Sequence, residues 1–343
     1  IVGGITLIPF VLKVAIGLVS DRVNLLGQGH RRPFIILGLV AQSAAFLLFP
    51  SLSPAEQYPL FVVLCLLAAL GMSTYDTCTD GLSIDTTPEE ERGIVQGIMV
   101  GGRALSAVVV AVAIGALSQR DQWPVVFLGI SLLGLLTIPL ALLVQEPRAR
   151  PAEQRFSQVA FRSLLDGAFL LFLLQGLVYP LTLWSANGMT GVFLNEALGV
   201  NLGRVGLYTS VFGLGTVTGG LTGGPLTKHV GRRTSILIAL LLTSATVFGL
   251  AVLPSPGLGW AVVFLFGVAF GCYETVYMTL GMDFADPRIA AFMFAIVMAV
   301  GNVGIGLGQP LSWALVDAVG FRWMFVVRGA LKLLALPAVY GVF

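Results

Sequence analysis

The stretch GLVSDRVNLLGQGHRRPFIILG, Gly17 to Gly38, places several charged side chains between two long apolar runs. Such clustering stands out because 57% of the 343 residues are hydrophobic and only 10% are charged. A soluble domain has about 45–50% apolar and about 25% charged residues, so this composition indicates a membrane protein. We therefore interpret the charged stretch as a hairpin between two membrane-spanning helices.

Apolar runs long enough to cross a bilayer recur along the chain, whose mean hydropathy is +0.93. A span needs about 20 mostly apolar residues, and a helix satisfies its own backbone hydrogen bonds in hydrocarbon. We predict an all-α membrane protein with eleven spans, near residues 1–20, 33–50, 59–84, 94–117, 123–144, 165–194, 205–228, 233–253, 258–282, 289–313 and 321–341. The chain opens inside an apolar run without a starting Met, so we expect one more span before these.

Several other classes of protein are not expected. The net charge of +2, without a Lys/Arg-rich block, gives no support for nucleic-acid binding. Cys65, Cys78 and Cys272 lie inside apolar runs without ligand spacing, so neither a disulfide framework nor a metal site follows. We see no phosphate-binding loop or nucleophile arrangement, and we expect no enzyme activity and no cofactor.

The basic residues divide unequally between alternate loops, which predicts the orientation in the membrane. One set of loops holds twelve Lys or Arg residues and the opposite set holds three, Arg120, Arg204 and Arg322. By the positive-inside rule the first set is cytoplasmic. The connector at 145–158 lies on this side, and we expect a monomeric, multi-pass protein of the bacterial inner membrane.

The chain also repeats itself. GLVSDRV…RRPFIILG returns as GPLTKHVGRRTSILIAL, and TYDTCTDGLSIDTTPEEERG is echoed by CYETVYMTLGMDFADPRIA. Tyr75, Asp76 and Asp85 thereby match Tyr273, Glu274 and Asp283 at a constant offset of 198. Parallel repeats joined by a cytoplasmic loop are typical of transporters built from two similar helical bundles.

These motifs resemble the major facilitator superfamily. GLVSDRV…GHRRPFI is similar to its signature after the second span, although Asn24 to Gly29 lengthen the loop, and ERGIVQGIMVGGRALSA is similar to its fifth span. Within the superfamily, the muropeptide permease and folate–biopterin transporter branches are the most similar. The resemblance implies a 6+6 helical bundle with the first span missing: a five-span half at 1–145, a cytoplasmic linker at 146–162 and a six-span half at 163–343.

The resemblance further implies a cytoplasmic gate in the charged hairpin and its repeat. Asp21 would lie near the N-terminus of the eleventh superfamily span, where the helix dipole favours a carboxylate. Arg22, Arg31 or Arg32 would face Asp85, in exposed pairs worth about 0–1 kcal/mol each. The candidate gate residues are Gly17, Asp21, Arg22, Arg31, Arg32, Asp85, Arg92, Lys228, Arg232 and Arg233. The alternative is that these charges only set the topology.

A second group of charges lies at one depth inside the spans. Counted from the cytoplasmic boundary at 1.5 Å per residue, Lys13, Asp76, Arg103 and Glu274 are each about 12–14 Å deep. Charges at such depth usually face one another or a polar cavity. The candidates for substrate binding or proton coupling are Lys13, Tyr75, Asp76, Asp80, Arg103, Gln175, Tyr179, Tyr273, Glu274 and Asn302.

Structural roles for these charges stay open. Asp76 and Arg103 could form a buried structural pair, and Lys13 could pair with Asp76 or Asp80. Glu274 has no evident cation at its depth in its own half, which makes it the better proton carrier because an unpaired buried carboxylate has a raised pKa. Arg328 and Lys332 could face the lipid interface or pair inward.

We therefore predict a secondary active transporter that moves a small organic solute by alternating access, with protons as the coupling ion. Its partners would be the solute, protons and the lipid bilayer, without nucleic acid. One alternative is a non-transporting factor that delivers pigment or assists complex assembly, because DGLSIDTTPEEERG also resembles superfamily members linked to light-harvesting complexes. Another is a sensor that binds solute without moving it.

Overall fold

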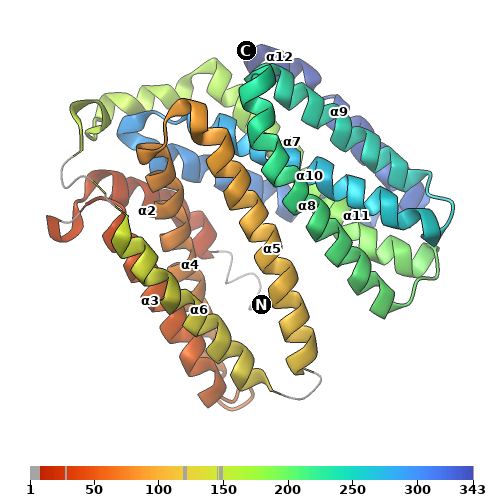
Figure 1. Ribbon diagram of the computed structural model, residues 1–343, viewed down its shortest axis with the longest axis horizontal. Coiled ribbons are helices and arrows are strands. Elements are labelled where there is room, and N and C mark those ends of the chain that lie inside the picture. Colours follow the sequence, from red (N-terminus) through yellow and green to blue (C-terminus); the bar gives the residue numbers. More distant parts are fainter. Residues whose placement is uncertain (1–7, 28, 119–121, 145, 147–149, 343) are drawn as a thin grey trace. The chain divides into compact units, whose positions relative to one another are not determined.

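The computed structural model describes residues 8–27, 29–118, 122–144, 146 and 150–342. Over these ranges the chain forms α-helices numbered α2 to α12, joined by turns and short 3-10 segments (Figure 1). The helices are α2 (Ile8–Arg22), α3 (Arg32–Leu48), α4 (Tyr58–Thr86), α5 (Arg92–Ser118), α6 (Trp123–Leu143), α7 (Gly167–Val192), α8 (Leu202–Val230), α9 (Arg232–Ala251), α10 (Pro256–Phe284), α11 (Ala290–Leu333) and α12 (Leu336–Val342).

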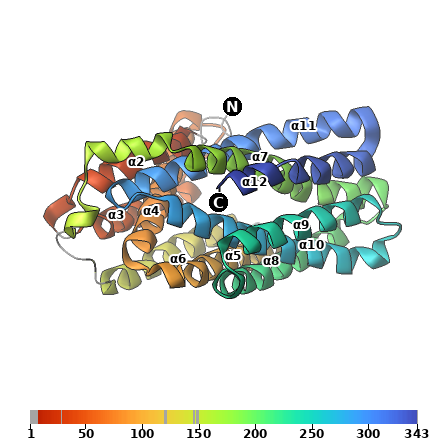
Figure 2. The same cartoon turned by 90° about the horizontal axis from the view of Figure 1, so that it is seen from above.

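The long helix α11 doubles back on itself at Gly320, which has φ 82° and ψ 165°. Two hydrogen bonds show the reversal, because Arg328 donates to the Ser312 hydroxyl and to the Gly308 carbonyl earlier in the same helix. Figure 2 shows this return of the blue segment. Gly231 joins α8 to α9 with nearly the same angles, φ 80° and ψ 164°. This backbone region is open almost exclusively to glycine.

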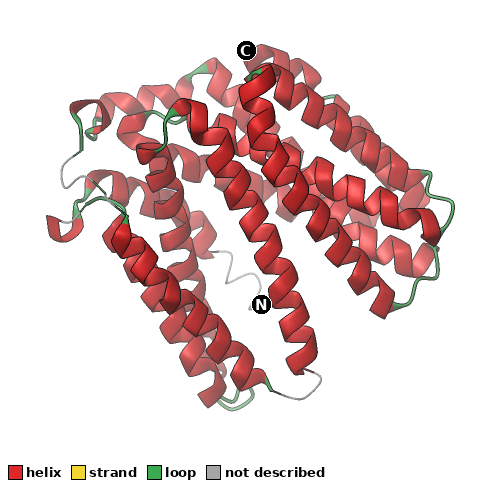
Figure 3. Cartoon of the chain, in the orientation of Figure 1, coloured by secondary structure: helices red, strands yellow, loops and turns green. Residues whose placement is uncertain are grey.

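The all-α prediction is confirmed, since the described residues contain no strand (Figure 3). Eight helical segments are long and apolar enough to cross a membrane. The short α2 and the Gly- and Thr-rich α8 are outside this set, because α2 has 15 residues and the composition of α8 lowers its hydropathy. The count of eleven spans stays a prediction.

The helices group into two compact units. The first comprises residues 1–87, 110–163 and 285–299. In it α3 packs on α4 and α6, and α2 packs on α4. Phenylalanine rings from these elements form a core, with Phe49 stacked on Phe127 at 5.2 Å between ring centroids and edge-on to Phe61 at 5.4 Å.

The second unit comprises residues 88–109, 164–284 and 300–343. Its centre is α10, which packs on α8 and α9 and is buried along most of its length. Glycines of α8 allow the two backbones to approach closely: a Cβ atom built on Gly223 would lie 3.1 Å from the Cys272 carbonyl oxygen. Small residues at helix interfaces permit such contacts in membranes.

Each compact unit contains a segment from the opposite half of the sequence. Residues 285–299 belong to the first unit, and residues 88–109 belong to the second. Close helix contacts explain the exchange, since a Cβ atom on Gly17 of α2 would lie 2.7 Å from the Ala291 carbonyl oxygen of α11. The repeat partner of Gly17, Gly224 of α8, contacts Gly93 of α5 in the same way. The predicted halves, 1–145 and 163–343, are sequence repeats and stay a prediction as domains.

The turn at Gly320 generates a test. We expect Gly320→Ala to lower the free energy of unfolding by about 1–3 kcal/mol, because an L-residue is strained at this φ and ψ. Gly306→Ala is the matched control, since Gly306 is helical and a Cβ atom there meets nothing within 4 Å. That control should be neutral or stabilising by up to about 1 kcal/mol. Thermal unfolding in detergent measures both, and equal melting temperatures would contradict the role of Gly320.

Candidate functional site

Two carboxylates and two guanidinium groups alternate at one end of the first unit. Asp21 Oδ1 accepts from Arg31 Nη2 at 2.5 Å and from Arg150 Nη2 at 3.4 Å. Asp85 Oδ2 accepts from Arg31 Nε at 2.9 Å and from Arg150 Nη2 at 2.7 Å. We call Asp21, Arg31, Asp85 and Arg150 the Asp21 network. Asp21 lies in the last turn of α2, Arg31 precedes α3 and Asp85 lies in the last turn of α4.

Asp21 also caps the start of α11. The backbone N–H groups of Ala291 and Phe292 donate to its carboxylate at 3.4 and 2.9 Å. The first N–H groups of a helix have no partner within it, and the helix dipole favours a negative charge there. Asp21 therefore lies at the helix terminus that the sequence indicated, while its role in a gate remains a prediction.

The burial of the Asp21 network differs from the expectation of exposed pairs. Asp21 and Arg31 are both 0% exposed. Burial alone would lower the pKa of Arg31, but the two carboxylates outweigh that effect and raise it above its ordinary value. The pair of Arg31 and Asp85, which was expected to be exposed, is also buried, with side chains 0% and 10% exposed. Loss of one partner would leave an uncompensated buried charge, so the estimate for an exposed pair does not apply to it.

The neighbouring charges have other contacts. Glu146 accepts from the backbone N–H groups of His30, Arg31 and Arg32 and so caps α3. Arg32 is half-buried, and within the described residues its side chain forms no hydrogen bond or ion pair. Arg22 is exposed, with its guanidinium 5.8 Å from the Phe156 ring centroid. Burial and the charge of Arg150 lower the pKa of His30, so its ring is neutral at pH 7.

The second unit repeats the pairing of Asp85 with Arg31. Asp283, the repeat partner of Asp85, accepts from Arg232 Nε at 2.7 Å and from Arg92 Nη1 at 3.0 Å. We call Arg92, Arg232 and Asp283 the Asp283 network. The other two candidates from this region lie apart from it: Lys228 is exposed, and Arg233 lies 4.8 Å from the Tyr340 ring centroid.

Lys13 and Asp76 form an ion pair inside the first unit. Lys13 Nζ lies 2.5 Å from Asp76 Oδ2, and the two side chains are 2% and 31% exposed. Of the two partners that the sequence left open for Lys13, the structure thus selects Asp76. Asp80 is buried one turn further along α4, and Tyr75 packs against the core around Ile35, Leu39 and Cys78.

Glu274 has a cationic partner, which corrects the premise that it is unpaired. Arg103 Nη1 lies 3.4 Å from Glu274 Oε1 in the second unit. The sequence missed this pair because Arg103 comes from the other repeat, on the part of α5 that joins the second unit. The pair is asymmetric: the Glu274 side chain is 6% exposed, whereas the Arg103 side chain is 45% exposed.

Aromatic candidates surround Glu274. Gln175 Nε2 donates to the Tyr273 hydroxyl at 2.9 Å, and the rings of Tyr179 and Tyr273 are 4.8 Å apart. The Tyr179 hydroxyl interacts with the Glu274 carboxylate and accepts from Trp184 Nε1 at 3.1 Å. The second unit therefore brings together Gln175, Tyr179, Tyr273, Glu274 and Arg103. Asn302 is half-buried on α11, and within the described residues its side chain forms no hydrogen bond to this group.

Sequence reasoning missed four polar residues that the structure places in central positions. Glu146 and Arg150 lie on the connector, where the sequence suggested only a linker and a topology signal. Arg328 and Lys332 are 2% and 3% exposed, although the sequence left open that they face lipid. For Arg328 and Lys332 the available signal was their spacing of four residues, which places both side chains on one side of a helix.

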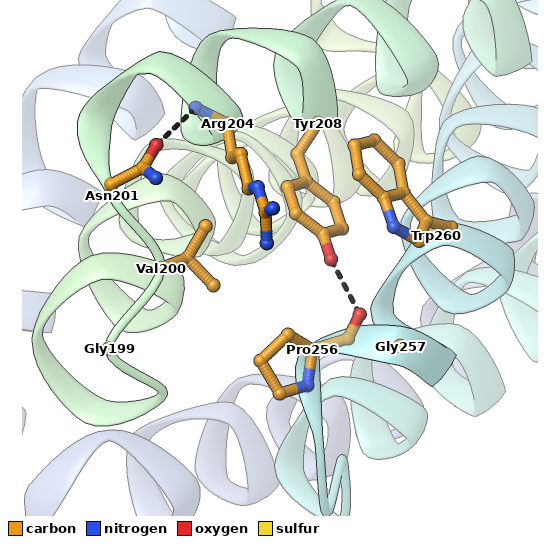
Figure 4. A pocket seen from close by; sticks show the side chains of 8 residues that line it. All are labelled: Gly199, Val200, Asn201, Arg204, Tyr208, Pro256, Gly257 and Trp260. Atoms are coloured by element: carbon orange, nitrogen blue, oxygen red, sulfur yellow. Dashed lines mark hydrogen bonds between the residues drawn. The ribbon is translucent and has the colours of Figure 1, made fainter.

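A separate pocket of about 510 Å³ opens where α8 and α10 begin (Figure 4). Trp260 stacks on Tyr208 at 3.8 Å between ring centroids, and the Tyr208 hydroxyl donates to the Pro256 carbonyl. The Asn201 side chain caps α8 by accepting from the Arg204 backbone N–H, while the Arg204 guanidinium points into the pocket. Trp260 lies fourteen residues before Glu274, or about 21 Å along α10, so this pocket is remote from the Glu274 pair.

The helical fold is that of a known family. The model of the Major Facilitator Superfamily matches residues 1–288 and 172–343. The chain belongs to the major facilitator superfamily. A solved structure has the same fold as this chain. The human organic anion transporter MFSD10 superposes on it with a TM-score of 0.81 at 13% identity, and the match covers 98% of this chain and 82% of that one.

Relatives in the superfamily differ in the solutes that their names give. The folate-biopterin transporter of Synechocystis is 28% identical over 228 residues, which are 62% of this chain and 44% of that protein. The human synaptic vesicular amine transporter is 21% identical over 337 residues, 94% of this chain and 62% of that protein. In both cases the chain spans less than two thirds of the relative.

The Asp21 network predicts a contrast between two adjacent arginines. Arg31→Gln should lower the free energy of unfolding by about 3–5 kcal/mol, because Asp21 and Asp85 would lose a buried partner. Arg32→Gln is the matched control, since in the described part of the chain Arg32 binds Glu146 through its backbone N–H and not through its side chain. This variant should change stability by less than about 0.5 kcal/mol. Thermal unfolding in detergent distinguishes them, and similar losses in both variants would refute the assignment.

Proposed function

We propose that this superfamily member is a secondary active transporter, which moves a small organic solute by alternating access and couples that movement to protons. The observation that carries the proposal is the asymmetric pair of Glu274 and Arg103. A buried carboxylate beside a solvent-exposed cation can exchange that partner for a proton, which is what a coupling residue requires.

The contacts around Glu274 support this assignment. The Tyr179 hydroxyl and the Arg103 guanidinium both approach the carboxylate, so a rotation of Arg103 leaves one hydrogen-bond partner in place. Tyr179 and Tyr273 lie beside it, and Gln175 fixes the Tyr273 hydroxyl. Protonation of Glu274 would thus alter one charge among groups that are otherwise neutral and hydrogen-bonded.

The two networks at the helix ends support a gate. In each network a carboxylate near the end of one helix binds arginines from other segments. The Asp21 network joins the first repeat to the connector, and the Asp283 network joins residues of both repeats. Ion pairs of this kind hold one arrangement until a competing state gains a few kcal/mol. We assign the Asp21 and Asp283 networks to the closed state of the cytoplasmic gate.

The rival functions receive no specific support. The two relatives described above are named as transporters of folate-biopterin and of amines. Delivery of an apolar pigment would not need charges such as Lys13 and Asp76 inside the helices. A sensor would bind solute and give no flux, and the experiment below separates it from a transporter.

The test reconstitutes the purified protein in liposomes with an internal pH indicator and an imposed pH gradient. Folate and tyramine serve as probes, since the two relatives are named for folate and for amines. A transporter coupled to protons should move protons together with at least one of these solutes. Binding of a probe without movement of solute or protons would favour the sensor. Solute uptake that is independent of the pH gradient would refute proton coupling.

Glu274→Gln tests the residue itself. We expect uptake driven by the pH gradient to fall by about tenfold or more, equivalent to about 1.4 kcal/mol, because the amide cannot carry a proton. Exchange of labelled for unlabelled solute without a gradient should survive. Glu196→Gln is the control, since Glu196 is exposed in the same unit, and it should leave both rates unchanged. Unchanged gradient-driven uptake in Glu274→Gln would remove this residue from the mechanism.

A further inference from the structure

The pocket where α8 and α10 begin contains a cation without a counter-charge. The Arg204 guanidinium points into this space of about 510 Å³, and none of the residues that line it is acidic (Figure 4). Within the described residues the Arg204 side chain forms no hydrogen bond and no ion pair. An arginine stays protonated and carries five N–H donors, so these donors are available to a ligand.

Another arginine of the second unit shows the contrast with a structural role. Arg322 belongs to the same predicted set of loops, and its guanidinium donates to the carbonyls of Ala251 and Leu253 at 3.2 and 3.0 Å. These carbonyls lie at the C-terminal end of α9, where a cation is favourable. Arg204 has no such acceptor, and Glu196, the acidic residue nearest to it in sequence, is exposed and forms no ion pair with it. Capping or pairing therefore does not account for the position of Arg204.

The starts of two helices reinforce the positive potential in the pocket. The helix α8 begins at Leu202 and α10 begins at Pro256, and residues at or just before these positions line the space. The N-terminus of a helix carries a partial positive charge. The full charge of Arg204 adds to both termini, so the pocket suits an anion and disfavours a cation.

Aromatic rings form one wall of the pocket. Trp260 lies parallel to Tyr208, with 3.8 Å between the ring centroids and 9° between the planes. Tyr208 is 2% exposed and its hydroxyl is held by the Pro256 carbonyl, whereas Trp260 is 37% exposed. Tryptophan and tyrosine are enriched where a membrane protein meets the headgroups of the lipids. The wall is thus fixed by packing and presents an indole at the membrane interface.

The rim beside the pocket is apolar. Leu202 follows the lining residue Asn201 and is 75% exposed, and Leu258 follows the lining residue Gly257 and is 58% exposed. The helix α10 is long and apolar enough to cross the membrane, so its start lies at the boundary between hydrocarbon and water. A cation and an apolar rim at this boundary together fit an amphiphile with a negative headgroup.

We infer that this pocket binds the phosphate group of an anionic phospholipid, with Arg204 as the charged partner and Trp260 beside the start of the acyl chains. The guanidinium fork matches the geometry of a phosphate. Sites for small ligands have volumes of about 300–1,000 Å³, so the pocket has room for a headgroup. A soluble phosphate would offer the same oxygens without acyl chains for the apolar rim. The site is remote from the Glu274 pair, and the inference does not rest on the transport proposal.

The first experiment adds lipid to the purified full chain after its lipids have been removed in detergent. The probes are phosphatidylglycerol, phosphatidylcholine and the soluble sn-glycerol 3-phosphate, and native mass spectrometry and thermal unfolding measure binding. Phosphatidylglycerol should bind saturably and raise the melting temperature, because a ligand of the folded state stabilises it. Phosphatidylcholine should bind more weakly, since its choline offsets the phosphate charge.

Two results of this experiment would overturn the inference. Equal binding of the two phospholipids would refute a site for an anion. An equal rise in melting temperature with sn-glycerol 3-phosphate, at the same concentration as phosphatidylglycerol, would assign the pocket to a soluble phosphate and refute the lipid.

Arg204→Gln tests the charged partner. Its affinity for phosphatidylglycerol should fall by about tenfold or more, because the amide loses a charge-assisted contact with the phosphate. The melting temperature without lipid should not change, since Arg204 is exposed and unpaired. Arg162→Gln is the matched control, because Arg162 is exposed in the 3-10 segment before α7, and its affinity should equal that of the wild type. Equal losses in both variants would indicate general attraction to basic residues and refute the site.

Gly257→Asp tests the location of the ligand while it keeps Arg204. Gly257 lines the pocket, and a Cβ atom built there meets nothing within 4 Å, so a side chain can be added without displacing others. The new carboxylate should compete with the phosphate for Arg204 and weaken phosphatidylglycerol binding by about tenfold. Gly206→Asp is the matched control, since Gly206 is equally open but lies outside the lining of the pocket. Similar binding by the two variants would overturn the assignment to this pocket.

Discussion

The carboxylate of Asp21 is the interaction on which the first unit depends. It is fully buried, binds the guanidinium groups of Arg31 and Arg150, and accepts from the first N–H groups of α11. One side chain thus connects the end of α2, the start of α3, the connector and a helix from the other repeat. Such a junction is stable only if every partner is present, because each charge removed from it leaves another one buried without compensation.

The second unit follows a different rule, in which aromatic rings and glycines replace much of the charge. The α8 and α10 backbones approach one another through Gly219 and Gly223, and the rings of Tyr179, Tyr273 and Tyr277 fill the space beside α7. Among the described residues of this unit, three acidic or basic side chains are buried, those of Glu274, Arg328 and Lys332. Their cost in an apolar interior is the physical reason to assign them functions, since packing alone would be better served by apolar residues.

Much of this arrangement could be predicted from the sequence, and the failures have specific causes. Hydropathy and the internal repeat predicted the helices, and of the three arginines that the resemblance left open as partners of Asp85, the structure pairs Arg31 with it. The partner of Glu274 was not predicted, because the repeat suggested a cation in the same half of the sequence, whereas Arg103 belongs to the other half. The roles of Glu146 and Arg150 could not be predicted, since nothing local to a polar connector shows which helix terminus it will reach. The burial of Lys332 was not predicted, because its position in the sequence does not reveal that aromatic rings cover it.

The single-residue connections at Gly231 and Gly320 bear on how the chain enters the membrane. In each case two long helices are joined without any loop that could be exposed to water while one helix waits for the other. We therefore expect each pair of helices to enter the membrane together as a hairpin, so that the buried face of the second helix packs on the first helix and not on lipid.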